Sequence, residues 1–386
     1  MAGQISGQAS RAVFLIAARR TVVAPKDGDL RSIAPHEMAV TAVEACLRDA
    51  KLSPDCIDEI VLSNCLGMGG NPARLTALQA GLPTHVAGLT IDRQCCGGLD
   101  ALLTAAALIR SGQADFVLAG GTESASLRPN CFAALPTGGY MDQPFNQAPF
   151  TPWPERDPDM HEAAARLARN LRISKEEQDA WAVKSHHKAR LSQGRMAGEI
   201  AAVPGTGAER DGFTRQLTME TCRRAKRVSD AITVANMAVA ADGAAMCLLV
   251  SERVAYSWPR IQLMAGATMG GDPELPGTAP VAAIETVMRC CNLHPDRLAV
   301  AEIMEAYAAQ AIACVNLASL PHDCVNPGGG SLARGHPVGA SGAILAVRLF
   351  HEIRTRPNGW GLAAIAAAGG LGTAMLLRNR GDPQER

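Results

Sequence analysis

Residues 97–121 read GGLDALLTAAALIRSGQADFVLAGG, and residues 342–370 read GAILAVRLFHEIRTRPNGWGLAAIAAAGG. Each stretch begins with small residues, continues through an apolar helical segment and a turn, and ends in an apolar strand-like run with two glycines. This similarity suggests that the chain contains two halves built on one pattern. Strand-like runs also alternate with helical ones elsewhere, as in Val13–Ile16, His36–Ala50 and Ile60–Leu62. The alternation predicts an α/β fold built from parallel βαβ units.

The composition is that of a large folded protein without a charge imbalance. The chain has 386 residues, of which 47% are hydrophobic and 19% charged, so a large core can be buried and general disorder is excluded. Lys and Arg total 37, as do Asp and Glu. A formal net charge of zero argues against a nucleic-acid-binding protein.

The cysteines and the apolar segments indicate the cellular environment. Twelve cysteines are present without any C-x-x-C spacing, which favours buried, reduced thiols in a cytoplasmic protein over disulfides or a metal site. The apolar run Val13–Ala18 is too short for the core of a signal peptide. The most apolar segment, Gly361–Leu377, is interrupted by four glycines. It is interpreted as buried core, and no membrane association is expected.

Between the two halves the sequence changes character. Residues 122–157 are rich in Pro and Gly and predict an irregular loop region. Two helices are predicted after it, Met160–Asn170 and Ser174–Gly194, the second with Ser174 as N-cap and Glu177 as its capping-box partner. The basic run Arg223–Arg227 fits a solvated face, and also a site for the phosphates of a nucleotide-like ligand.

Two motifs carry candidate chemistry, whereas the usual glycine-rich nucleotide-binding, hydrolase and zinc-protease motifs are absent. The first is IDRQCCGGLDA, residues 91–101, where a cysteine pair precedes a helix start. A thiol there meets the positive end of the helix dipole, which favours the thiolate. The second is NPGGGSLARGHPVGASG, residues 326–342, in which His336 is held between Gly and Pro. Alone, each residue also fits a structural role, but together they favour Cys–His nucleophilic catalysis.

With these two motifs and several others, the sequence resembles the thiolase family over nearly its whole length. The other segments are Gly120–Ser124, Ile173–Ala182, Ala241–Ala245, Ala279–Ile284, Glu302–Tyr307 and Gly369–Gly372. The resemblance implies an α/β thiolase fold, with duplicated βαβ halves stacked in αβαβα layers and an inserted loop domain that binds coenzyme A. The expected division is residues 1–258, with the loop domain at about 122–242, and residues 259–386.

The resemblance also implies roles for individual residues. Cys95 matches the family's acylated nucleophile, because the spacing to the following glycines selects it over Cys96. His336 matches the base that activates it, and Asn326 matches the Asn that opens the histidine motif. An oxyanion hole is expected from the backbone amides of Cys95 and Ala368, with His336 stabilising a second oxyanion.

Substrate contacts are expected at Met160, Arg223, Ala238 and Tyr307. Ala238 and its neighbour replace a Ser-Gly pair of the family, so an altered contact with the acyl-CoA is expected. The implied substrate is a coenzyme A thioester or an acyl-carrier protein, together with a small-molecule or carrier-bound acceptor. No other cofactor, no metal and no nucleic-acid partner are implied, and a homodimer or homotetramer is expected.

Two departures from the family affect the second half of its reaction. Ala366 occupies the position of the second catalytic cysteine, which exchanges the α-proton of the second acyl-CoA. Loss of a general acid/base typically costs about 10²–10⁴ in rate. Met304 replaces the Asn of the Asn-Glu-Ala-Phe segment and cannot donate a hydrogen bond to an enolate oxygen. Both changes leave acylation of the nucleophile intact.

Four functions fit this pattern. The leading hypothesis is an acyltransferase of specialised metabolism that forms an acyl-Cys95 thioester and passes the acyl group to a carbon or other nucleophilic acceptor. The second is an ordinary β-ketothiolase with a substitute base, for which Glu305, Tyr307 and His161 are candidates. The third is a decarboxylative, ketosynthase-like condensation. The fourth is a catalytically silent thiolase-like subunit, against which the retained cysteine and histidine argue.

Overall fold

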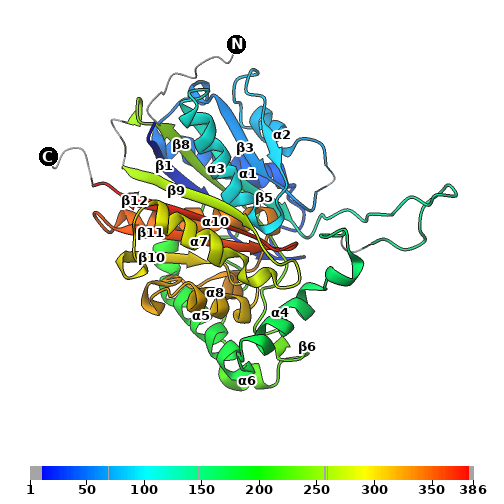
Figure 1. Cartoon of the computed structure of the whole chain (residues 1–386). Helices are drawn as coiled ribbons and strands as arrows, with labels where there is room; N and C mark the ends of the chain where they lie inside the picture. The colour runs from blue at the N-terminus through cyan, green and yellow to red at the C-terminus, as the bar shows by residue number, and fades with distance from the viewer. Residues whose placement is uncertain (1–10, 68, 146–147, 256–257, 259, 382–386) are drawn as a thin grey trace, which may run out of the picture.

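A computed structural model describes the chain except at its two ends and at a few internal positions. The described residues are 11–67, 69–145, 148–255, 258 and 260–381. Residue 259, where the second half is predicted to begin, lies outside them. The main body is a mixed sheet with helices on both faces, and a long arm extends from it after strand β5 (Figure 1).

The main sheet contains ten strands in the order β10-β11-β12-β9-β1-β8-β5-β3-β4, with β2 paired to β8. Its strands are β1 (Val13–Arg20), β2 (Ala24–Pro25), β3 (Glu59–Ser63), β4 (Leu89–Ile91), β5 (Phe116–Ser124), β8 (Ala241–Ser251), β9 (Ile261–Gly270), β10 (Leu298–Ile303), β11 (Trp360–Ala367) and β12 (Leu371–Asn379). A separate two-stranded ribbon is formed by β6 (Arg227–Ser229) and β7 (Ile232–Thr233).

The strand order repeats, which agrees with the predicted duplication. In the first half β3 and β5 are parallel, and β8 and β1 follow antiparallel. In the second half β10 and β11 are parallel, and β12 and β9 follow antiparallel. The halves join edge to edge through a short antiparallel pairing of β1 with β9. The predicted parallel βαβ pairing is confirmed for β3 with β5 and β10 with β11, and antiparallel strands complete each half.

The helices form layers on and between the two halves of the sheet. The helices are α1 (Pro35–Ala50), α2 (Pro72–Gln79), α3 (Gly97–Arg110), α4 (Met160–Asn170), α5 (Lys175–Met196), α6 (Met219–Arg223), α7 (Ala279–Cys290), α8 (Ala308–Leu317), α9 (Ser331–Arg334) and α10 (Val338–Arg354). Helices α3 and α10 share the central apolar core with strands of both halves. Helices α1 and α2 cover the outer face of the first half, and α7 and α8 that of the second. This is the expected αβαβα order.

The two central helices cross where both carry glycine. A Cβ on Gly98 would lie 2.3 Å from the backbone nitrogen of Ala343, and a Cβ on Gly342 would lie 2.5 Å from that of Leu99. Real Cβ atoms do not approach backbone so closely, so only glycine permits this crossing. The crossing brings the N-terminal ends of α3 and α10 together, and with them the two sequence motifs that precede these helices.

The region between β5 and β8 contains the expected loops and helices. Strand β5 continues to Ser124, and an irregular arm then leads to α4. Helix α5 begins as predicted: the Ser174 hydroxyl accepts a hydrogen bond from the Glu177 amide, and the Glu177 carboxylate accepts one from the Ser174 amide. Among the described residues, no helix combines the length and the apolar character needed to cross a bilayer.

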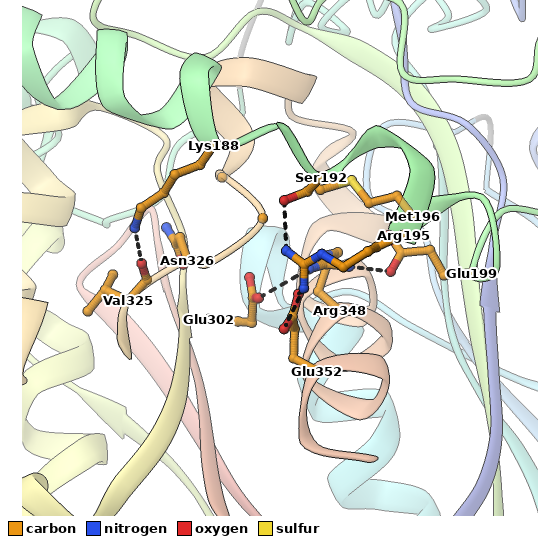
Figure 2. Close-up of polar contacts among 12 residues, drawn as sticks. Lys188, Ser192, Arg195, Met196, Glu199, Glu302, Val325, Asn326, Arg348 and Glu352 are labelled. Carbon is orange, nitrogen blue, oxygen red and sulfur yellow. Dashed lines mark hydrogen bonds and ion pairs between the residues drawn. The ribbon is translucent and has the colours of Figure 1, made fainter. Parts of the chain in front are cut away.

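A buried network of charged residues ties α10 to the end of α5. Figure 2 shows Arg348 of α10 between Glu199 and Glu352, with Arg195 also directed at Glu352. Glu199 also pairs with Arg20 of β1. Although burial opposes ionisation of Glu199, the two arginine charges hold its pKa at about 2. Glu199 therefore stays ionised at neutral pH, and its ion pair with Arg348 fixes the helix that follows His336.

Candidate active site

Cys95 is presented by a sharp turn between a strand and a helix. Strand β4 ends at Ile91, and a single turn of 3₁₀ helix, Gln94–Cys96, leads into α3. Gln94 has a φ of 50°, in the left-handed region that residues other than Gly rarely adopt. Gly97 then packs against Ser63, whose Oγ would lie 2.1 Å from an added Cβ. This turn is strained where the nucleophile stands, as is common at functional sites.

His336 reaches the same place from the other half of the chain. Gly335, with a φ of 114°, makes the turn between α9 and the histidine. The His336 backbone amide donates to the Val239 carbonyl over 2.8 Å, and His336 forms a β-bridge with Ala240. The ring is thus fixed by backbone pairing before α10 begins.

The two side chains are in contact, although 241 positions separate them. Cys95 Sγ lies 3.2 Å from His336 Nε2. On the other side of the ring, His336 Nδ1 lies 2.7 Å from Ser341 Oγ. The Ser341 hydroxyl donates its own proton to the Pro337 carbonyl over 2.9 Å, so it accepts from Nδ1–H. Nε2 is therefore left without a proton and can accept that of the Cys95 thiol.

The electrostatics of the site keep both partners neutral. Burial raises the pKa of the Cys95 thiol to about 12, and the negative charges of Glu123 and Asp92 act in the same direction. Burial lowers the pKa of His336 to about 4. The helix terminus does not outweigh this burial, so the thiolate expected from the sequence is not the resting form. The pair is a thiol and a neutral imidazole, which suits general-base catalysis.

Cys96 and Ala366 lie next to the pair but take no part in it. Cys96 Sγ points into the core and donates to the Ile365 carbonyl over 3.5 Å. The residue after Ile365 in β11 is Ala366, at the position of the family's second cysteine. The local strand is therefore in place, but it carries a methyl group with no proton to exchange.

The Asn326 side chain is hydrogen-bonded to the end of β10 and to Glu305, and it is not directed at the Cys95 thiol. Its Oδ1 accepts from the Ile303 amide over 2.7 Å, and its Nδ2 donates to the Ile303 carbonyl and to Glu305 Oε1 over 2.9 Å each. Glu305 also accepts from Trp181 and Ser185. These bonds hold the end of β10, and they leave the Glu305 carboxylate poorly suited to act as a substitute base.

Met304 and Ala368 lie at the ends of two neighbouring strands. Met304 follows β10 and is fully buried, and its sulfur accepts a hydrogen bond from Ser331 Oγ over 3.2 Å. Ala368 follows β11 and is also buried. The amide of Cys95 lies beside its own thiol, where it acts to lower the pKa of that thiol.

The four residues expected to contact the substrate divide into two groups. Ala238 donates its backbone N–H to the Ala306 carbonyl over 2.9 Å, which places it beside Tyr307. Met160 begins α4, and the next residue, His161, is hydrogen-bonded to Tyr307. Arg223, in contrast, is exposed at the end of α6, at the lower tip of the view in Figure 1.

Sequence reasoning missed two residues that organise the site. Ser341 orients His336, and the available signal was a hydroxyl residue within the first turn of the helix after the histidine. Glu123, on β5, accepts from the amides of Cys65, Leu66 and Gly339. It thereby links the loop after β3 to the start of α10. Burial raises its pKa to about 7.

Family models, curated relatives and solved structures match the chain over nearly its whole length. Two family models match the chain: thiolase, N-terminal domain, over residues 13–253, and thiolase, C-terminal domain, over residues 258–379. The β-ketoadipyl-CoA thiolase of Escherichia coli is 34% identical over 399 residues, covering 95% of this chain and 99% of that protein. The crystal structure of Bacillus anthracis acetyl-CoA acetyltransferase matches with a TM-score of 0.88 and 29% identity, covering 97% of this chain and 100% of that one. Human mitochondrial 3-ketoacyl-CoA thiolase in complex with CoA matches with a TM-score of 0.86 and 26% identity, covering 96% and 98%.

Proposed function

Because the chain belongs to the thiolase family of acyltransferases, we propose that it forms an acyl thioester on Cys95 from an acyl-CoA and passes the acyl group to a nucleophilic acceptor. The observation that carries this proposal is the contact of 3.2 Å between Cys95 Sγ and a His336 ring whose other nitrogen is bonded to Ser341. That arrangement contains the nucleophile, its base and the group that orients the base.

Acylation follows from the contacts of these residues. The Cys95 thiol transfers its proton to His336 Nε2 as the sulfur attacks the thioester carbonyl of the donor. The Nδ1–H bond to Ser341 stabilises the imidazolium that forms. The carbonyl oxygen becomes an oxyanion, for which the amides of Cys95 and Ala368 are the proposed donors. The C–S bond to CoA then breaks, and His336 returns the proton to the leaving CoA thiolate.

The proposed donor is a CoA thioester. The E. coli relative is named for β-ketoadipyl-CoA, and the human neighbour was solved with CoA. We assign the acyl-CoA contact to Met160, Ala238 and Tyr307, which lie together: Ala238 donates to the carbonyl of the residue before Tyr307, and Tyr307 is hydrogen-bonded to His161, the residue after Met160. The same proposal includes an acyl-carrier protein as a second donor. It also includes a role in specialised metabolism, and both depend on which acceptor the enzyme uses.

Three other functions were open from the sequence. A silent subunit would not need a cysteine, a histidine and an orienting serine held in hydrogen-bonding geometry, so this structure disfavours it. A decarboxylative condensation avoids α-proton abstraction and would use the same Cys95 acylation. A β-ketothiolase needs a replacement for the missing cysteine, and Glu305 is bound by several donors already.

We also propose that the protein is a homodimer that pairs near the outer end of the first half-sheet. Strand β4 is the edge strand there. Leu75 and Leu78 on α2 and Leu89 on β4 are 50%, 49% and 43% exposed. Exposed leucines beside an open strand edge are typical of a contact surface. Analytical ultracentrifugation of the purified chain tests this, and a monomer at micromolar concentration would contradict it.

Intact-protein mass spectrometry after incubation with a panel of acyl-CoAs tests the proposed acylation. The wild-type chain is expected to gain the mass of the acyl group, and Cys95→Ala to gain nothing. Cys96→Ala is the matched control, because Cys96 is turned into the core and bonded to Ile365; this variant should acylate like the wild type. An adduct that persists in Cys95→Ala, or no adduct with any donor, would overturn the proposal.

A further inference from the structure

A second hydrogen-bonded pair of ionisable side chains lies in the same region of the molecule. The hydroxyl oxygen of Tyr307 is 2.9 Å from Nδ1 of His161, and the two rings meet edge to face with centroids 5.8 Å apart. Tyr307 follows β10 and His161 lies in the first turn of α4, so the pair joins the second half of the chain to the region between β5 and β8. Neither residue takes part in the Cys95–His336 contact.

The backbone places Tyr307 close to His336, the partner of the Cys95 thiol. Tyr307 forms a β-bridge with Met237, and His336 forms one with Ala240. Both residues therefore flank one short extended segment, in which three residues span about 10 Å. Ala238 within that segment donates to the carbonyl of the residue before Tyr307. Tyr307 and His336 are thus held at neighbouring positions along one segment.

The charges agree with this placement. Burial raises the pKa of the Tyr307 hydroxyl, and the negative charge of Asp159, and that of Cys95 when it is a thiolate, act in the same direction. The pKa of the phenol therefore depends in part on the charge of the reacting sulfur. The phenol remains protonated at neutral pH, so it can relay a proton only if its partner takes or supplies one. An imidazole can accept a proton at one ring nitrogen and pass it on, and His161 is only partly buried.

Other side chains near the site either form hydrogen bonds with neighbouring groups or have no proton to exchange. The Glu305 carboxylate is bound by Trp181, Ser185 and Asn326. The thiol of Cys65 donates to the Gln94 carbonyl over 3.3 Å. The position of the missing cysteine carries only the methyl group of Ala366.

We propose that Tyr307, coupled to His161, is the catalytic group that moves the proton at C2 of an acyl-CoA acceptor, so that acyl transfer from Cys95 forms a carbon–carbon bond. This inference rests on the proposed acyl-Cys95 function and names its acceptor class. Tyr307 and His161 would then supply the proton transfer that the second cysteine performs in the family, at whose position this chain has Ala366.

The step balances without any further reactant. The Tyr307 oxygen takes a proton from C2 while its own proton passes to His161 Nδ1, and the C2–H electron pair becomes the enolate. C2 attacks the acyl-Cys95 carbonyl, and the sulfur leaves with its bonding pair. The thiolate is reprotonated from solvent through His336, and His161 releases its proton to solvent. The reverse sequence protonates the leaving enolate in thiolysis.

Deuterium exchange into C2 of acetyl-CoA in D₂O, read by mass spectrometry, separates this step from acylation. Tyr307→Phe is expected to lower the exchange rate by about 10²–10⁴ while still forming the Cys95 adduct. Tyr140→Phe is the matched control, since Tyr140 is 70% exposed on the arm, and it should exchange like the wild type. A wild type that acylates but does not exchange, or a folded Tyr307→Phe that exchanges at the wild-type rate, overturns this inference and leaves the acylation proposal standing. A wild type that never acylates overturns the acylation proposal instead.

His161→Ala provides a second test that a folding defect cannot imitate. The variant is expected to lose exchange by a similar factor and to recover part of it when free imidazole is added. Loss of exchange without any rescue at high imidazole, or no loss at all, would remove His161 from the relay. Acylation of Cys95 in the same variant shows that the first half of the reaction is intact.

Discussion

The hydroxyl of Ser341 sets the direction in which His336 can move a proton, and Ser341→Ala tests this. In the native structure Nδ1–H has an acceptor at 2.7 Å, which leaves Nε2 free to take the Cys95 proton. Without the hydroxyl, the tautomer with its proton on Nε2 is no longer disfavoured. That tautomer cannot accept from Cys95, so the variant should acylate more slowly although both reacting residues are retained.

The size of the effect follows from the burial of this contact. Ser341 is 2% exposed, so water does not readily replace the lost acceptor. An unsatisfied buried donor costs about 1–3 kcal/mol, which corresponds to a rate loss of about 5- to 150-fold. The loss should fall on acylation of Cys95, because the imidazolium formed in that step depends most on the Nδ1–H bond.

Quenched-flow acylation with mass detection measures this rate. Ser331→Ala is the matched control, because Ser331 is a buried serine at the start of α9 that donates to Met304 and not to His336. It should acylate within a few-fold of the wild type. A folded Ser341→Ala with the wild-type acylation rate would refute the orienting role, and circular dichroism of each variant identifies a fold defect.

Three further predictions concern pH, the altered family positions and the helix crossing. Because burial holds the pKa of His336 at about 4, the base is neutral above that value. The acylation rate, measured in stopped assays with a fluorescence check of folding, should be constant from about pH 6 to 8 and fall only as the pH drops toward 4. A fall in rate with an apparent pKa near 6.5, the value of a free histidine, would contradict the neutral pair. Ala366→Cys combined with Met304→Asn should raise acetyl-CoA condensation, measured as acetoacetyl-CoA formed, and a folded double variant without any gain would show that other departures block it. Gly342→Ala should lower the free energy of unfolding by about 3 kcal/mol or more, because its Cβ would lie 2.5 Å from the backbone of α3. Gly194→Ala, where nothing lies within 4 Å, should be neutral or stabilising by up to about 1 kcal/mol in the same urea titration.

Much of the local structure could be predicted from short-range patterns. The helix Met160–Asn170 has the predicted bounds, the next helix begins after its predicted N-cap Ser174, and the apolar runs near Val13, Ile60 and Phe116 are strands. The strands are longer than predicted because pairing with neighbours extends them beyond their apolar centres. The antiparallel completion of each half was not predicted, because periodicity within one strand does not reveal the direction of its partner.

The sequence by itself determined the family, the two-fold repeat and the candidate pair Cys95 and His336, because motif spacing and local propensity are properties of contiguous residues. Only the tertiary structure decided which groups meet. The Cys95–His336 contact spans 241 positions and the Tyr307–His161 contact 146, and both exist because the helix crossing and the strand register bring distant segments together. The same packing turned Asn326 toward β10, and it partly buried the Cys95 thiol and so raised its pKa, which keeps its resting form neutral. Burial and hydrogen-bond partners belong to the assembled fold, so residue type alone could not assign these roles.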